Sequence, residues 1–235
     1  MKPWVILCDF DGTISVEDVT DALLERYGEP GWEDLEEDWR RGRISSRVCM
    51  QQQIGMLRAT AAELDAEAES FRIDPDFPAF VAAVRAANGQ IAVVSDGLDR
   101  LIRAILARHG LEDLPVFANH LSQVGPDRWQ LESPCADKTC RVDAGTCKCA
   151  RAQQAHAAGQ PVMLVGDGAS DFCVAHQADL VFAKHRLIEH CRTHGLNHFP
   201  IVGFGDAIGL LTALERGLDE FDHAAAPDKE LESNE

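Results

Sequence analysis

Residues 4–13 read Trp-Val-Ile-Leu-Cys-Asp-Phe-Asp-Gly-Thr, and the rest of the chain is best understood from this stretch. The apolar run from Trp4 to Cys8 predicts a short buried strand. Asp9 and Asp11 follow it, and two carboxylates so close to a buried strand are costly unless a cation compensates their charge. Mg²⁺ prefers such oxygen ligands, and ligands bind at the carboxyl ends of strands in open α/β sheets. We therefore expect a metal-dependent site here.

The bulk composition limits the class of protein. A chain of 235 residues with 46% hydrophobic residues fits one large domain, or a core with an inserted subdomain. The net charge of −17 disfavours nucleic acid and anionic membranes as partners. No transmembrane run and no signal peptide can be read, so we expect a cytoplasmic protein, as a monomer or homodimer.

The periodicity of apolar residues changes near residue 88. Residues 15–87 predict helices alone, and Thr60 with Glu63 forms the pattern of a capping box. From residue 90 strands alternate with helices, which implies a doubly wound parallel sheet of the α/β class. The predicted strands are 4–8, 90–94, 116–123, 128–131, 162–165, 180–182 and 199–202. The later predicted helices are 98–109, 151–158, 172–177, 187–194 and a last one to residue 216, which Asp206 caps.

Three later stretches carry polar residues at strand or helix ends. Ser95 lies in Val-Val-Ser-Asp-Gly, Lys148 precedes a predicted helix, and residues 166–171 read Gly-Asp-Gly-Ala-Ser-Asp. Taken alone, Ser95 could be a turn residue and Lys148 a solvent lysine. Together with Asp-Phe-Asp-Gly-Thr, and in this order, the stretches resemble the motifs of the haloacid dehalogenase (HAD) superfamily of phosphatases.

This resemblance implies a Mg²⁺-dependent phosphatase that hydrolyses a small-molecule phosphate monoester through an aspartyl-phosphate. Asp9 would be the nucleophile and Asp11 the general acid and base. Asp96 stands where the family often has glycine, and we expect its carboxylate to point away from the phosphate. The resemblance further implies phosphate binding by Ser95, Gly97 and the catalytic Lys148, Mg²⁺ ligation by Asp9, Asp11 and Asp167, and a supporting role for Asp171 toward water or Lys148.

The helical block after the first strand resembles the small all-helical cap of HAD enzymes, which closes over the site. We therefore expect a Rossmann-like HAD core formed by residues 1–14 and 88–218, with an inserted cap of residues 15–87. The alternative is a single domain in which these helices are ordinary layers. Residues 219–235 hold seven acidic residues and one lysine, and we expect a disordered tail there.

Further features are Asp18, Trp32, Asn119-His120, the Cys135–Cys140 pair, Gly-Thr-Cys-Lys at 145–148 and Leu-Asn-His-Phe-Pro at 196–200. They resemble one branch of the superfamily, akin to phosphoserine phosphatase. That branch contains the methionine-salvage phosphatase that acts on 2-hydroxy-3-keto-5-methylthiopentenyl-1-phosphate.

The predicted substrate preference depends on the cap. Phosphoserine phosphatases carry a cap arginine that pairs the substrate carboxylate, whereas we align glutamines 51–53 with that position. Asp18 and Trp32 would instead face a neutral substrate. A phosphoserine phosphatase-like enzyme, a phosphotransferase and a catalytically silent phosphometabolite-binding protein remain alternatives, although the presence of both Asp9 and Asp11 argues against the last.

Cysteines and histidines form two further patterns. Cys135, Cys140, Cys147 and Cys149 could hold a structural Zn²⁺, although the spacing is irregular and lacks a Cys-x-x-Cys pair. Free thiols and a Cys135–Cys140 disulfide are the alternatives. His185, His190, His194 and His198 recur every three to five residues. We interpret them as the solvent-facing side of a helix, with a metal site as the alternative.

Overall fold

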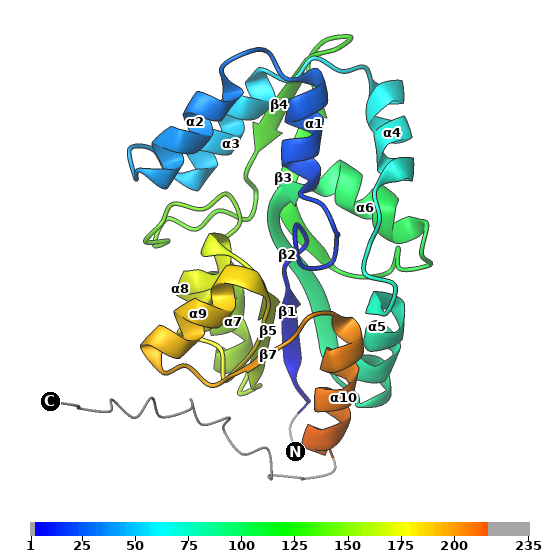
Figure 1. Ribbon diagram of the computed structural model, residues 1–235, viewed down its shortest axis with the longest axis vertical. Coiled ribbons are helices and arrows are strands. Elements are labelled where there is room, and N and C mark those ends of the chain that lie inside the picture. Colours follow the sequence, from blue (N-terminus) through cyan, green and yellow to red (C-terminus); the bar gives the residue numbers. More distant parts are fainter. Residues whose placement is uncertain (1–2, 216–235) are drawn as a thin grey trace, which may run out of the picture.

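The computed structural model describes residues 3–215, and a seven-stranded sheet lies at its centre (Figure 1). The strands are β1 (Val5–Cys8), β2 (Gln90–Leu98), β3 (Val116–Gln123), β4 (Trp129–Glu132), β5 (Val162–Gly166), β6 (Leu180–Ala183) and β7 (His198–Pro200). Their order is β4-β3-β2-β1-β5-β6-β7, and all neighbours are parallel except β3 and β4. The expected α/β class with a parallel sheet is confirmed. The tail predicted at 219–235 lies outside the described residues.

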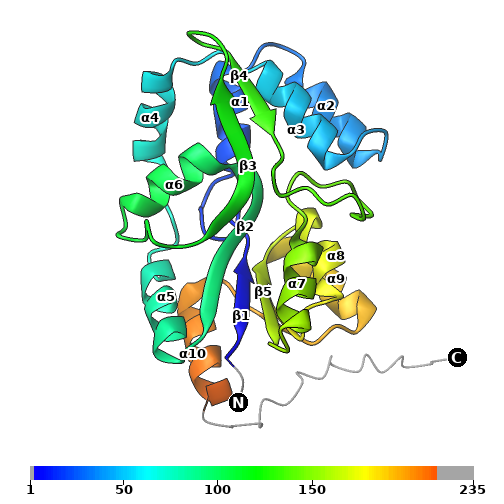
Figure 2. The same ribbon diagram turned by 180° about the vertical axis from the view of Figure 1, so that it is seen from behind.

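Helices cover both faces of the sheet (Figures 1 and 2). They are α1 (Val19–Tyr27), α2 (Trp32–Arg40), α3 (Ser46–Gly55), α4 (Ala61–Ser70), α5 (Phe77–Ala86), α6 (Asp99–Ala107), α7 (Lys148–Ala157), α8 (Phe172–Ala175), α9 (His185–His194) and α10 (Phe204–Glu215). Within residues 3–215 no helix is long and apolar enough to cross a membrane.

Each central strand supplies side chains to two separate cores, as the period of two in a strand requires. Ile6 and Cys8 of β1 pack with the layer of α5, α6 and α10, and Leu7 packs with the layer of α7, α8 and α9. In the first layer the Phe204 ring lies 4.8 Å from that of Phe77, centroid to centroid. Burying one such ring stabilises the fold by roughly 1.5–3 kcal/mol. These two cores fix the sheet, and with it the ends of β1, β2 and β5.

The helical insert between β1 and β2 is present, and α1 to α4 lie beyond the carboxyl end of the sheet (Figure 1). The β3–β4 hairpin extends up to them (Figure 2), where β4 packs on α3 and the Trp129 indole N–H donates to the Ala59 carbonyl over 2.8 Å. In contrast α5, inside the predicted 15–87 range, packs against β2 and α10. We propose that the cap comprises α1 to α4 and that α5 belongs to the core.

Several element boundaries differ from the predicted ones. Strand β2 continues to Leu98 instead of ending at residue 94, because its pairing with β3 resumes after an irregularity between Val94 and Leu98. Helix α7 begins at Lys148, three residues early, which places that side chain in the first turn. Asp206 does not cap α10. It lies within the first turn, and its carboxylate accepts the Val202 N–H over 2.8 Å.

The predicted capping box of α4 is present and carries a stability prediction. The Thr60 hydroxyl oxygen accepts the Glu63 N–H over 3.2 Å, and the Glu63 carboxylate accepts the Thr60 N–H over 2.7 Å. We expect Thr60→Ala to lower the free energy of unfolding by about 1 kcal/mol, because N-terminal N–H groups lose their acceptor. Urea denaturation measures this change. Thr60→Ser keeps the hydroxyl and should match the wild type; equal losses in both variants would contradict the assignment.

Candidate active site

The predicted site residues gather where three neighbouring strands end. Strand β1 lies between β2 and β5, and the register sets Cys8 level with Val93 and with Val165. Asp9 therefore stands beside the last part of β2, where Ser95 and Gly97 lie, and beside the end of β5. Three stretches that are far apart in sequence therefore meet at this edge of the sheet.

A buried lysine connects two carboxylates at the centre of the site. The Lys148 ammonium lies 2.7 Å from Asp9 Oδ2 and 2.6 Å from Asp171 Oδ1. Relative exposures are 5% for Asp9, 3% for Lys148 and 0% for Asp171. Burial lowers the pKa of Lys148, but the charges of Asp171 and Asp9 outweigh burial and hold that pKa above its ordinary value. Lys148 is thus a fixed cation beside Asp9.

Asp171 contacts the loop after β5 in addition to Lys148. Its Oδ2 atom accepts the Asp167 N–H over 3.0 Å. A Cβ at Gly166 would lie 2.3 Å from the same oxygen, so only glycine fits there. Gly166 therefore allows the Asp171 carboxylate to lie close to the backbone of this loop.

Asp167 lies beside the turn after β1. Its Oδ1 atom accepts the Thr13 hydroxyl over 3.0 Å, and Gly12, with φ +69°, leaves room for its Oδ2 atom. Burial first, and then the charge of Asp9, raise the pKa of Asp167. Such a surplus of buried negative charge is relieved by a cation.

Carboxylate oxygens of Asp9, Asp167 and Asp171 all lie within 4.8 Å of one another. This set of hard oxygen donors fits Mg²⁺. Both oxygens of Asp171 are engaged by Lys148 and by backbone N–H groups. Asp9 Oδ1 accepts the Phe10 N–H over 2.8 Å and Asp9 Oδ2 contacts Lys148 and Ser170, whereas the hydrogen bond that Asp167 accepts from Thr13 involves Oδ1. We therefore expect Asp167 Oδ2 to be the most readily available metal ligand of the three residues.

Asp11 lies opposite the end of β2, at the entrance to the cap. Its Oδ1 atom accepts the Val19 N–H over 2.9 Å, which ties it to the start of α1. A Cβ at Gly97 would lie 2.5 Å from its other oxygen, so this glycine makes room for the carboxylate. Burial, followed by the charge of Asp18, raises the pKa of Asp11 well above its ordinary value. A carboxyl that retains its proton can act as an acid.

Three polar side chains of the site were not singled out in the sequence. The Ser170 hydroxyl donates to Asp9 Oδ2 over 3.2 Å, and Thr13 bonds Asp167 as described. Both residues belong to the sequence motifs described above, so the sequence contained the signal for them. The buried Lys184 ammonium donates to the Thr13 carbonyl over 3.0 Å. It follows the apolar strand β6 without a motif, and no signal indicated it.

A cavity of about 580 Å³ separates the strand ends from the cap. Asp18 lines it and also caps α1 by accepting the Asp21 N–H over 2.9 Å. Trp32 is not among the lining residues: it packs beside Gly28 at the start of α2, and Trp39 lines the cavity. A contact of Trp32 with the substrate stays a prediction. The cap side of the cavity is formed by Asp18, Thr20, Asp21, Glu36, Trp39, Arg40, Ser46, Cys49, Met50 and Gln53.

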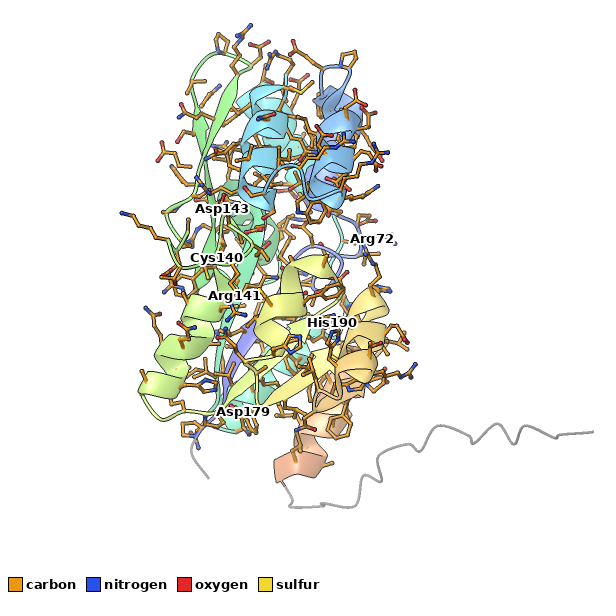
Figure 3. The ribbon with its side chains drawn as sticks, turned by 90° about the vertical axis from the view of Figure 1, so that its left-hand side faces the viewer. Arg72, Cys140, Arg141, Asp143, Asp179 and His190 are labelled. Atoms are coloured by element: carbon orange, nitrogen blue, oxygen red, sulfur yellow. The ribbon has the colours of Figure 1, made fainter. Side chains whose placement is uncertain are left out.

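Polar contacts tie the cap to the loop before α7. Asp96 accepts the Thr146 N–H over 2.6 Å and the Ser46 hydroxyl over 3.2 Å, so both carboxylate oxygens are held by the loop and by α3. The Arg47 guanidinium makes two hydrogen bonds with the Asp143 carboxylate, at 2.9 and 3.0 Å. Figure 3 shows Asp143 on this loop, between the cap helices and the core. The loop therefore supports the cap over the site.

All eight cysteines are free thiols, so the alternative of a Cys135–Cys140 disulfide is not realised. Cys140, Cys147 and Cys149 line a second cavity together with Cys173, whose sulfur lies 3.3 Å from that of Cys149. Cys135 is not part of this lining. Within residues 3–215 only Asp9/Asp167/Asp171 and His176/His190/His194 bring donor atoms of three His, Cys, Asp or Glu residues within 4.8 Å of one another, so the four cysteines considered for zinc are not assembled as a metal site.

Comparison with known proteins agrees with this geometry. A family model described as haloacid dehalogenase-like hydrolase matches residues 6–176. A 2-hydroxy-3-keto-5-methylthiopentenyl-1-phosphate phosphatase from Exiguobacterium sp. strain AT1b is 30% identical over 203 residues, covering 86% of this chain and 94% of the relative. The phosphatase of the same name from Geobacillus kaustophilus is 30% identical over 222 residues, covering 91% and 98%.

Solved structures share the fold. A substrate-bound phosphoserine phosphatase has a TM-score of 0.66 at 16% identity, over 89% of this chain and 99% of that chain. A probable phosphoserine phosphatase from Vibrio cholerae has a TM-score of 0.70 at 19% identity, over 94% and 68%. Because the family model spans most of the sequence and the two relatives align over nearly their whole length, this chain belongs to the haloacid dehalogenase-like hydrolases and is a phosphatase.

Proposed function

We propose that this chain is a Mg²⁺-dependent phosphatase that uses Asp9 as its nucleophile and acts on a small phosphate monoester with an uncharged tail. The observation that carries the proposal is the buried Asp9 carboxylate, which contacts Lys148 and Ser170 under the cap cavity. The preferred substrate in this proposal is 2-hydroxy-3-keto-5-methylthiopentenyl-1-phosphate, after which the relatives from Exiguobacterium and Geobacillus are named.

The first half of the reaction follows from the positions of Asp9 and Asp11. An Asp9 oxygen attacks phosphorus, and the bond from phosphorus to the leaving oxygen breaks. Asp11, whose raised pKa favours the protonated form, gives its proton to that leaving oxygen. Lys148 keeps its positive charge beside the transferred phosphoryl group, and Ser95 of the neighbouring strand β2 lines the cavity.

The second half returns the enzyme to its starting state. Asp11, now ionised, takes a proton from a water molecule that attacks phosphorus, which breaks the bond between Asp9 and phosphate. Mg²⁺ held by Asp9, Asp167 and the backbone carbonyl of Asp11 would supply charge that offsets repulsion between carboxylate and phosphate. Asp171 keeps Lys148 in place through its 2.6 Å contact. Omitting Mg²⁺ from a p-nitrophenyl phosphate assay is therefore expected to remove activity.

Phosphate binding involves Ser95 more directly than Gly97. The Gly97 N–H donates to the Ser95 hydroxyl oxygen over 2.9 Å, which leaves the hydroxyl hydrogen free to point into the cavity. Gly97 itself contributes space for Asp11. We therefore propose that Ser95 and Lys148 are the side chains that contact phosphate. Gly97 has no side chain and so leaves room for the Asp11 carboxylate and the Ser95 hydroxyl.

The charges of the cap side of the cavity support an uncharged substrate tail. Asp18, Asp21 and Glu36 line it, and the cap arginine among the lining residues, Arg40, already pairs with Glu36 over 3.3 Å. Of the glutamines at 51–53 only Gln53 lines the cavity. A substrate carboxylate would meet surplus negative charge there, and desolvating it without a cation would cost several kcal/mol.

Substrate choice can be tested by comparing kcat/KM for the methionine-salvage enol phosphate and for O-phosphoserine at equal Mg²⁺ concentration. We expect the enol phosphate to be preferred by more than about tenfold, which corresponds to about 1.4 kcal/mol. A tenfold preference for phosphoserine would contradict the proposal and would point to Arg40 or Arg186, the arginines among the lining residues, as the partner of its carboxylate. Arg43 and Arg47 are poorer candidates, because neither is among the residues that line the cavity, and they pair with Asp38 at 2.7 Å and with Asp143 at 2.9 Å.

A further inference from the structure

Three histidines form a cluster on the surface of the core, outside the phosphatase site. His176 directly follows α8, and His190 and His194 stand one turn apart on α9. One ring-nitrogen donor atom from each lies within 4.8 Å of the other two. His190 is half-buried, and the other two are exposed. Figure 3 labels His190 among these helices of the core.

Two of the rings are held by contacts other than those between the ring nitrogens. His194 Nδ1 lies 2.8 Å from the His190 carbonyl oxygen. An Nδ1–H that donates to this carbonyl leaves His194 Nε2 with its lone pair, and metal-ligating histidines are commonly fixed in this way. The His190 ring stacks on Phe172, with centroids 4.1 Å apart and planes 3° from parallel. Two of the three rings are therefore held in place before any ligand binds.

The contact between His176 and His190 shows that at least one of the two rings has an unprotonated nitrogen. Their Nε2 atoms lie 3.2 Å apart, so one ring donates and the other must be an unprotonated acceptor. A divalent ion can replace the shared hydrogen between these nitrogens. An ordinary solvent-facing helix surface does not require rings from two helices to converge in this way.

We propose that His176, His190 and His194 form a binding site for a borderline divalent transition-metal ion of the Zn²⁺, Ni²⁺ or Co²⁺ class. Neutral imidazole suits these ions, whereas the carboxylates of the phosphatase site suit Mg²⁺. Three nitrogen ligands leave coordination positions for water, as in other open three-histidine sites. Histidines one turn apart on a helix present their nitrogens on the same face, and the third ligand ties α8 to α9.

The test uses Co²⁺ as the probe, with the full chain in saturating Mg²⁺ so that the carboxylate site is occupied. A cavity lined by Cys140, Cys147, Cys149 and Cys173 also includes His176 in its lining and is the competing soft-ligand site. Visible absorption distinguishes them, because thiolate ligation adds intense sulfur-to-cobalt charge-transfer bands that nitrogen ligation lacks. The variants are His190→Gln and His194→Gln, with His109→Gln as the matched control at an exposed position on another helix end.

We expect one Co²⁺ per chain with a nitrogen-type spectrum, and a loss of affinity of more than about tenfold in His190→Gln and His194→Gln, since even outer-shell changes cost roughly 10–100-fold. His109→Gln should bind as the wild type does. Mg²⁺-dependent p-nitrophenyl phosphate turnover should be unchanged in all three variants, because none touches the phosphatase site. Unchanged Co²⁺ affinity in His194→Gln, a spectrum dominated by sulfur charge transfer, or no Co²⁺ binding by the wild type would overturn the proposal.

Discussion

Asp9→Asn is expected to abolish phosphatase turnover, with a loss of kcat on the order of 10⁶-fold, the scale seen when a catalytic nucleophile is removed. The substitution removes the attacking charge and changes little volume. Lys148 keeps its 2.6 Å contact with Asp171, so the buried cation does not lose every partner. Steady-state assays with p-nitrophenyl phosphate measure the loss of kcat, and circular dichroism with urea denaturation checks that the fold and its stability are kept.

The control for this variant is Asp113→Asn, which removes an exposed carboxylate that pairs with Arg85 over 2.8 Å and is not among the residues that line the cavity. It should retain wild-type kcat. Substantial turnover by purified Asp9→Asn, beyond what contaminating enzyme explains, would show that another group attacks phosphorus.

Asp11→Asn is expected to slow hydrolysis by about 10²–10⁴-fold for alkyl phosphates, whose leaving oxygen needs a proton. The loss should be much smaller for p-nitrophenyl phosphate, because p-nitrophenolate leaves without one. An asparagine can still accept the Val19 N–H that holds Asp11, so the start of α1 should stay in place. The measurement is kcat/KM for both substrates in the wild type and the variant.

Asp38→Asn is the matched control for Asp11→Asn, since Asp38 lies on the cap, pairs with Arg43 and does not line the cavity. It should not change the ratio between the two substrates. Equal losses for alkyl and p-nitrophenyl phosphate in Asp11→Asn would mean either that Asp11 is not the acid, or that hydrolysis of the aspartyl-phosphate limits both reactions.

The site could be predicted where a polar residue directly follows a buried strand. The run before Asp9 and the run before Asp167 mark β1 and β5, and parallel neighbours must end at the same edge. Ser95 followed from the same logic, although β2 continues beyond it to Leu98. Lys148 was found by its motif, but its burial between Asp9 and Asp171 depends on how α7 packs, which local sequence does not specify.

The cap was predicted less well because its contacts are tertiary. Helices α1 to α4 follow from periodicity and capping. The pattern does not say which face of α2 is turned to the cavity, and the tryptophan among the lining residues is Trp39. Likewise Cys173 joins Cys140, Cys147 and Cys149 from a different helix. The histidine spacing on α9 was visible, but the third member, His176, comes from the end of α8.

The central claim is that phosphate passes through a covalent bond to Asp9. It is tested most directly by acid-quenching the enzyme during turnover of a radiolabelled phosphate ester, digesting it, and locating the label. The account predicts label on the peptide that carries residues 4–13, released by hydroxylamine as an acyl phosphate is, and absent from Asp9→Asn. Label that resists hydroxylamine and maps to a hydroxyl residue such as Ser95 or Ser170 would contradict it.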